Sequence, residues 1–319
     1  MKVTHVSLQQ TDAARMAGRP ALTPELLAAS GARYSRNNEG LESILSRIDF
    51  EHPDRSVDGI FRMIDYGHQS IADMVPVAMF LDGVSIALAY YVWSICPTAG
   101  GQESSTRYIQ LGPEGLLDPE ELGIPDDLRD LWLKNALDGF ETYQKALEFW
   151  QSVGENNPQL VRIPAKLRDD TSEKARQQIA RMARNFAFDR SRYWLPVGAK
   201  TNFMLVMSAR GWVQLCQHLL SHPWREANRL GEAIRIELEL VAPRLLKHAE
   251  AKESIKRGIR DELRYWMTFA QACQNNNTLD NADVYYCADS GPHLQVMKPL
   301  GSHGDAAMAL AHHDNRYAW

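Results

Sequence analysis

The stretch that decides the fold is residues 75–108, VPVAMFLDGVSIALAYYVWSICPTAGGQESSTRY. Its first part, residues 75–81, is mostly apolar and predicts a strand, with Pro76 near the start, where a missing donor does least harm. Residues 85–93 have almost no polar face and predict a largely buried helix. Pro97 would stop that helix, so the polar segment behind it would emerge from a rigid, packed element.

The polar segment, residues 102–108, reads QESSTRY and follows a predicted turn at Gly100-Gly101. It combines a carboxylate, hydroxyls and an arginine in one short run. An arginine fork binds phosphate bidentately, hydroxyls fill the remaining oxygens, and a carboxylate orients donors. The segment therefore predicts a site for an anion that carries a polar ring, although the string by itself is more typical of a solvated loop.

Outward from this stretch, the hydrophobic periodicity predicts a mixed α+β chain. The long amphipathic pattern at residues 126–153 carries an aromatic stripe, which predicts core or a subunit interface. The other predicted elements are strands at residues 2–8 and 201–207, and helices that open at Thr23-Pro24 or span residues 57–66, 171–188, 209–220 and 224–246.

The composition narrows the class of protein. The chain has 319 residues, 45% of them hydrophobic, and a formal charge of −5, which argues against a nucleic-acid polymer as partner. Its 4 cysteines show no C-x-x-C spacing, and no apolar run is long enough to span a membrane, so we expect a soluble protein of the reducing cytoplasm. His303, His312 and His313 lack the spacing of a metal site, and we expect a C-terminal tail that docks through Tyr317 and Trp319.

QESSTRY is similar to the second half of the signature of the flavin-dependent thymidylate synthases, R-H-R-x-x-S-x-N-E-x-S-x-R-Y, with matches at Glu103, Ser105, Arg107 and Tyr108. Residues 67–91 resemble the lead-in of that family, and residues 192–210 resemble its R-x-x-L-P and T-x-N-A-R blocks. The resemblance covers roughly residues 1–250. It predicts a family-like domain at 1–250 and a C-terminal extension at 251–319.

The resemblance implies a thymidylate synthase-complementing-protein-like fold, in which long helices flank a central sheet. It also implies a homotetramer whose active sites form between subunits. Such a site would bind FAD, a uridine mononucleotide and methylenetetrahydrofolate, with NADPH reducing the flavin for carbon transfer to uracil C5.

Carried over residue by residue, the resemblance assigns catalytic roles to Glu103, Ser105 and Arg107. These three would bind the nucleotide together with Gln102, Thr106 and, from another subunit, Arg192. The residues assigned to the flavin side are Ser35, His68, Ser70, Asp73 and Ser208, and we add His218 and His222 as histidines that could compensate for the basic residues of the family that this chain lacks. Ser35 fits a helix cap equally well, and so do the two helical histidines.

The Arg-His-Arg half of the signature is missing. It falls on residues 95–97 or on residues 93–95, depending on the register, and neither register supplies a basic residue. We therefore expect weakened flavin binding. Three hypotheses stay open: a flavin-dependent nucleotide methyltransferase, a nucleotide-binding homologue without flavin chemistry, or an enzyme with flavin-independent chemistry.

Overall fold

The computed structural model of this chain describes residues 1–35, 40–65 and 67–275, with side chains as far as residue 265. The chain divides into two compact units, and the break follows Ile255. The predicted tail residues His303, His312, His313, Tyr317 and Trp319 lie outside the described residues. Among the described helices, none combines the length and the apolar character needed to cross a bilayer.

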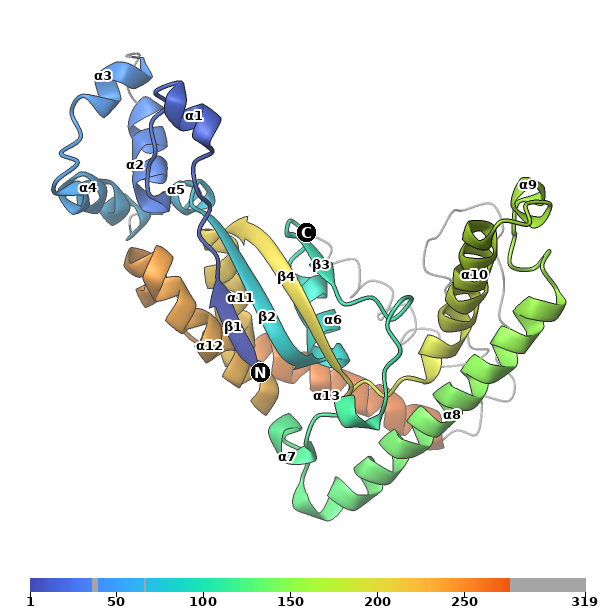
Figure 1. Ribbon diagram of the computed structural model, residues 1–319. Coiled ribbons are helices and arrows are strands. Elements are labelled where there is room, and N and C mark those ends of the chain that lie inside the picture. Colours follow the sequence, from blue (N-terminus) through green and yellow to red (C-terminus); the bar gives the residue numbers. More distant parts are fainter. Residues whose placement is uncertain (36–39, 66, 276–319) are drawn as a thin grey trace, which may run out of the picture. The chain divides into compact units, whose positions relative to one another are not determined.

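A four-stranded sheet forms the centre of the first unit (Figure 1). Its order is β1 (Lys2–His5), β2 (Pro76–Ser85), β4 (Lys200–Ser208) and β3 (Gly100–Glu103), and all neighbours are antiparallel. The predicted α+β class, a central sheet flanked by helices, is therefore confirmed.

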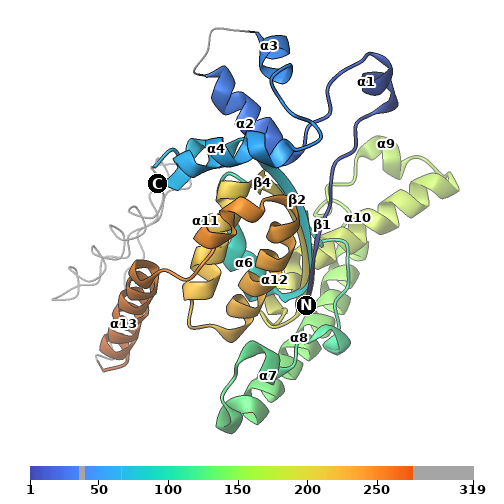
Figure 2. The same ribbon diagram turned by 90° about the vertical axis from the view of Figure 1, so that its left-hand side faces the viewer.

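One face of the sheet carries the core. Helices α6 (Ile86–Ile95), α11 (Ala209–Ser221) and α12 (Arg225–Val241) cover it (Figure 2). Strand β4 alternates as a one-sided strand should: Leu205 is fully buried, whereas Val206 beside it is 42% exposed. The other face of the sheet therefore keeps exposed apolar side chains, with Phe80 also 42% exposed.

At one end of the sheet lies a group of short helices, α1 (Asp12–Met16), α2 (Pro24–Tyr34), α3 (Leu41–Leu45), α4 (Pro53–Asp65) and α5 (Ser70–Asp73). The predicted cap at Thr23 is confirmed, because its hydroxyl accepts a bond from the amide of Leu26 at 3.4 Å. Gly67 has a φ of 98°, the left-handed conformation expected beyond a helix end. His68 follows it and is exposed, as predicted.

Beyond the other end of the sheet runs an arm, residues 129–194, made of α8 (Arg129–Asn156), α9 (Ala165–Arg168), α10 (Glu173–Ser191) and the 3₁₀ turn η3 (Arg192–Trp194). Phe140, Tyr143 and Phe188 form its buried cluster, against which Leu111 packs. In the aromatic stripe predicted for this region, Phe140 and Tyr143 are core and Trp132 and Trp150 are half-buried. The remaining elements are η1 (Pro113–Gly115), α7 (Pro119–Leu122), η2 (Asp126–Leu128), η4 (Pro243–His248) and α13 (Glu253–Asn275).

Two predictions of local structure are wrong. Gly100-Gly101 is not a turn but the start of β3, and Gly101 is required by close approach: a Cβ there would lie 2.1 Å from the carbonyl oxygen of Met204. The helix predicted for residues 224–246 ends at Val241, because Pro243 cannot continue it and opens η4 instead.

Candidate functional site

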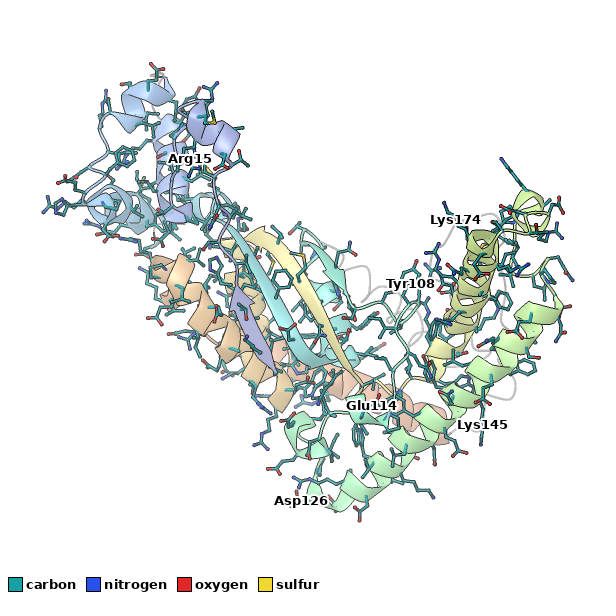
Figure 3. All side chains as sticks on the ribbon, in the orientation of Figure 1. Arg15, Tyr108, Glu114, Asp126, Lys145 and Lys174 are labelled. Carbon is teal, nitrogen blue, oxygen red and sulfur yellow. The ribbon has the colours of Figure 1, made fainter. Side chains whose placement is uncertain are left out.

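The polar segment continues from β3 into a loop, residues 104–111, which we call the signature loop. The Ser104 amide extends the sheet by donating to the carbonyl of Asn202 at 2.8 Å. A turn follows, in which the Ser105 carbonyl accepts from the amide of Tyr108 at 3.1 Å, and the Ser105 hydroxyl accepts from the amide of Arg107 at 3.2 Å. This turn exposes the Arg107 and Tyr108 side chains (Figure 3).

Glu103 is held at both carboxylate oxygens. Oε2 accepts from the indole Nε1 of Trp93 at 3.1 Å, and Oε1 accepts from the hydroxyl of Thr201 at 3.1 Å. Both donors come from packed elements, α6 and β4. A carboxylate oxygen has a second lone pair, so this fixed, partly buried group can still orient donors of a ligand.

Arg107 forms a bidentate ion pair with Asp189 in the last turn of α10. Its Nε donates to Oδ1 at 2.6 Å and its Nη2 donates to Oδ2 at 2.9 Å. This carboxylate raises the pKa of the Arg107 guanidinium. The Arg107 side chain is 50% exposed, so it lies within reach of a dissolved anion.

The other predicted substrate residues lie on β3, in the turn and just beyond α10. Gln102 is exposed on β3 opposite Met204, and Thr106 is half-buried in the turn. Arg192 opens η3 at the junction that follows α10, three residues beyond Asp189, with its guanidinium 5.6 Å from the ring centroid of Tyr193. Within one chain, the structure thus joins the signature loop to the helix end that carries Arg192.

The predicted flavin residues fall into two groups. The first lies where β2 begins and β4 ends: Asp73 accepts from the Nη1 of Arg210 at 2.9 Å and from the Ser208 hydroxyl at 3.4 Å. Ser208 also caps α11 by accepting from the amide of Gly211 at 3.2 Å. His68 and Ser70 precede Asp73 and are exposed.

The second group lies at the opposite end of α11, about 20 Å away for a helix of 13 residues. The His222 ring accepts from the amide of Trp224 at 3.1 Å and lies 4.9 Å from the ring of Tyr91. Burial lowers the pKa of His218, and burial together with its neighbour His218 lowers that of His222. Ser35 belongs to neither group, and its hydroxyl donates to the carbonyl of Ala32 at 2.9 Å as a helix-end cap.

Residues 93–97, where the resemblance expects Arg-His-Arg, hold no cation, and their polar atoms are used inside the protein. The Trp93 indole binds Glu103, and the Ser94 hydroxyl donates to the carbonyl of Tyr91 at 2.7 Å. Cys96 is buried, which raises the pKa of its thiol to about 12. This segment therefore does not fit the flavin-contacting role.

Sequence reasoning missed three contributors: Asp189, Thr201 and Arg210. Arg210 was within reach of prediction, because it ends the matched block at residues 192–210. Asp189 and Thr201 were not, since each lies more than 80 residues along the chain from its partner in the signature segment. Within the described part of the chain, no group of three or more His, Cys, Asp or Glu side chains could hold a metal ion.

Comparison with known proteins identifies the family of this chain. A family model described as thymidylate synthase complementing protein matches residues 21–244. A UPF0159 protein of Thermoplasma acidophilum is 24% identical over 240 residues, which cover 68% of this chain and 47% of the relative. A UPF0159 protein of Chlamydia pneumoniae is 24% identical over 270 residues, which cover 76% of this chain and 49% of the relative. The chain thus spans about half the length of the curated relatives it matches.

Solved structures give fold likenesses with TM-scores below 0.5. Thymidylate synthase X from Helicobacter pylori, crystallised with FAD and dUMP, has a TM-score of 0.47 at 15% identity and covers 78% of this chain and 99% of that one. A UMP/dUMP methylase from Streptomyces cacaoi, bound with 5-Br dUMP, has a TM-score of 0.44 at 17% identity. The match covers 77% of this chain and 93% of that one.

Proposed function

This chain belongs to the thymidylate synthase complementing protein family, and we propose that it is an enzyme that methylates C5 of a uridine mononucleotide. One observation supports this most: within the family match, the Glu103 carboxylate is fixed at both oxygens, and the half-exposed Arg107 fork follows it in the same loop. A fixed acceptor and a cationic fork suit a base and a phosphate joined by a sugar.

In this proposal, Arg107, Ser105 and Thr106 bind the phosphate, with Arg192 as a further cation. Glu103 and Gln102 orient the uracil. Methylenetetrahydrofolate would donate the carbon: a bond forms between that carbon and uracil C5, the bonds between that carbon and the folate nitrogens break and release tetrahydrofolate, the C5 proton leaves, and the equivalent of a hydride reduces the methylene group to methyl. NADPH would be the source of the reducing equivalents.

FAD remains the proposed cofactor, bound more weakly than the complete signature would bind it. Asp73, Ser208, His68 and Ser70 support a polar subsite at one end of α11. Residues 93–97 do not support one, since their polar groups already have partners in the protein. No step of the reaction is therefore assigned to residues of that segment.

We also propose a homotetramer with active sites between subunits. Phe80 and Val206 support it, since each leaves 42% of its surface exposed on the uncovered face of the sheet. Residues 1–250 would form the catalytic domain and residues 251–319 an extension. The buried free thiols Cys96 and Cys216 support a reducing compartment, the cytoplasm.

A second candidate function is nucleotide binding without flavin chemistry. The bond between Trp93 and Glu103 favours it, because a hydrogen bond inside the protein, from a segment without a basic residue, already occupies one oxygen of the carboxylate. A flavin-independent reaction on the same fold is the third hypothesis, and it predicts turnover that does not respond to added FAD.

Tritium release from [5-³H]dUMP and [5-³H]UMP tests all three. We expect release with FAD, NADPH and methylenetetrahydrofolate present, and its loss in Glu103→Gln. Tight nucleotide binding without release would support the binding-protein alternative, and release that is equal with and without FAD would support flavin-independent chemistry. A wild-type chain that neither binds nor reacts with either nucleotide contradicts the proposed function.

A further inference from the structure

The ion pair between Arg107 and Asp189 joins two elements of unequal rigidity. Arg107 lies in a turn with exposed neighbours, whereas Asp189 lies in the last turn of α10. That helix end is packed, because Ala187 and Phe188, which directly precede Asp189, are buried in one cluster with Phe140 and Tyr143 of α8. The ion pair therefore holds the long, flexible side chain of Arg107 against a packed helix.

The arm holds the signature loop at further points. The side-chain Nε2 of Gln110 donates to the side-chain Oε1 of Gln144 on α8 at 2.9 Å. Leu111, at the end of the loop, packs against the buried cluster of Phe140, Tyr143 and Phe188. Figure 1 shows the loop passing from β3 toward the arm. Position and orientation of Arg107 are thus set by the arm as well as by the loop.

The geometry of the pair leaves one edge of the guanidinium available. Asp189 occupies Nε and Nη2, the side edge of the fork. Among the described residues, no other side chain bonds the guanidinium, so the end edge formed by Nη1 and the second Nη2 proton is unpaired there, in a side chain that is 50% exposed. A guanidinium has five N–H donors in a fixed fork, and either edge can bind an oxyanion bidentately.

We propose that Asp189 is a positioning residue for phosphate binding: it holds the side edge of Arg107 and leaves the end edge for the phosphate of the nucleotide. This rests on the proposed function, which places a phosphate at Arg107. The physical gain is conformational. An arginine side chain has high rotamer entropy, and a side chain that is ordered before the ligand arrives does not lose that freedom on binding.

The opposite role is a competing anion, since a carboxylate can mimic phosphate at an arginine. The two roles differ in sign. A positioning residue strengthens phosphate binding, and its loss weakens it. A competitor must be displaced by the ligand, so its loss strengthens binding. Asp189 occupies only the side edge and leaves the end edge without a side-chain partner among the described residues, which favours positioning.

Asp189→Asn tests the sign, because it keeps the shape of the side chain but removes the charge and one acceptor. Calorimetry with dUMP and with deoxyuridine should show dUMP bound roughly threefold to tenfold more weakly, the cost of ordering one long side chain. Deoxyuridine, which has no phosphate, should bind unchanged. Asp189→Glu should recover part of the loss. Asp126→Asn is the matched control, since it removes an equal charge from an exposed pair with Arg129 at 2.7 Å.

The double variant with Arg107→Ala separates positioning from a general structural effect. If Asp189 acts through Arg107, Asp189→Asn has no further effect on dUMP binding once Arg107 is gone. A further loss in that background, tighter or unchanged binding in the single variant, or an equal loss for deoxyuridine would each overturn the proposal.

A ligand-free measurement keeps this inference distinct from the proposed function. The Nε–Hε group of Arg107 can be followed by ¹⁵N relaxation, and we expect an ordered group in the wild type that becomes mobile in Asp189→Asn but not in Asp126→Asn. Mobility that is equal in all three proteins overturns the positioning role. A wild type that fails to bind dUMP, yet shows this change in order, contradicts the proposed function and the phosphate but leaves the arm holding Arg107.

Discussion

The indole Nε1 of Trp93 donates a hydrogen bond to Oε2 of Glu103 at 3.1 Å. In the register that puts Arg-His-Arg on residues 93–95, Trp93 stands at a position expected to be basic and also fixes the carboxylate of the retained half of the signature. The ring of Trp93 lies 6.0 Å from that of Phe203, so the bond is set within the packing of α6 against β4. In that register, the loss of a basic residue and the orientation of Glu103 are one structural feature.

Trp93→Phe should test this relationship. The variant keeps an aromatic ring but removes the N–H donor, and a hydrogen bond to a charged group contributes about 1.5–3 kcal/mol. We expect lower affinity for uridine nucleotides by calorimetry, with the native fold retained by circular dichroism. Ser94→Ala is the control, because it removes a bond to the carbonyl of Tyr91 on the same helix. Equal affinity in Trp93→Phe and wild type would detach Glu103 from the nucleotide site.

Arg107→Ala should weaken the binding of uridine monophosphates. The guanidinium is half exposed, so we expect a loss of about 1.5–3 kcal/mol, the range for a charge-assisted bond, and less than a buried cation would contribute. Affinity should also fall with ionic strength in the wild type but hardly in the variant. Calorimetry at two salt concentrations measures both effects. An unchanged affinity would remove Arg107 from the site.

FAD should bind at least about a hundredfold more weakly than it would to a complete signature, because two lost charge-assisted contacts correspond to at least about 3 kcal/mol. Fluorescence titration with FAD, with and without dUMP, measures this. The absorption spectrum of the purified protein gives a first reading, which we expect to show little flavin. Stoichiometric flavin that copurifies with the chain would contradict the prediction and indicate that other residues replace the basic contacts.

Assembly should depend on the uncovered face of the sheet. Light scattering of the wild type should give the mass of a tetramer, and Val206→Asp should reduce it, because a charge would enter an apolar interface. Gln178→Asp, on an exposed position of α10, should leave the mass unchanged. A wild type that is monomeric at micromolar concentration would contradict an active site formed between subunits.

Acid should destabilise the fold through the histidines at the end of α11. Both have a pKa lowered from 6.5, chiefly by burial. The folded state therefore binds fewer protons than the unfolded state. The contribution of these neutral histidines to the free energy of unfolding is present above pH 6.5 and is lost as pH falls below it. Urea unfolding between pH 5 and pH 7.5 should show this slope, and the double variant His218→Gln/His222→Asn should flatten it. The exposed Gln178, which does not titrate, should leave the slope unaltered when changed to Asn.

The sequence by itself determined the elements and the family. Strand β2 and helix α6 follow from apolar runs whose length and periodicity are local properties, and the cap at Thr23 follows from residue types that suit a helix start. The motif at residues 102–108 was also local, so its retained carboxylate, hydroxyl and arginine could be read without a structure.

Only the tertiary structure decided how that motif is held. The partners of Glu103 and Arg107 include Thr201 and Asp189, which are 98 and 82 residues away along the chain, and no local pattern encodes such pairs. The same holds for Gly101. Its neighbours in the sequence suggest a turn, but in the structure it lies in a strand so close to the β4 backbone that only a residue without a side chain fits. Local preferences depend on neighbours in sequence, but hydrogen bonds and close contacts depend on neighbours in space.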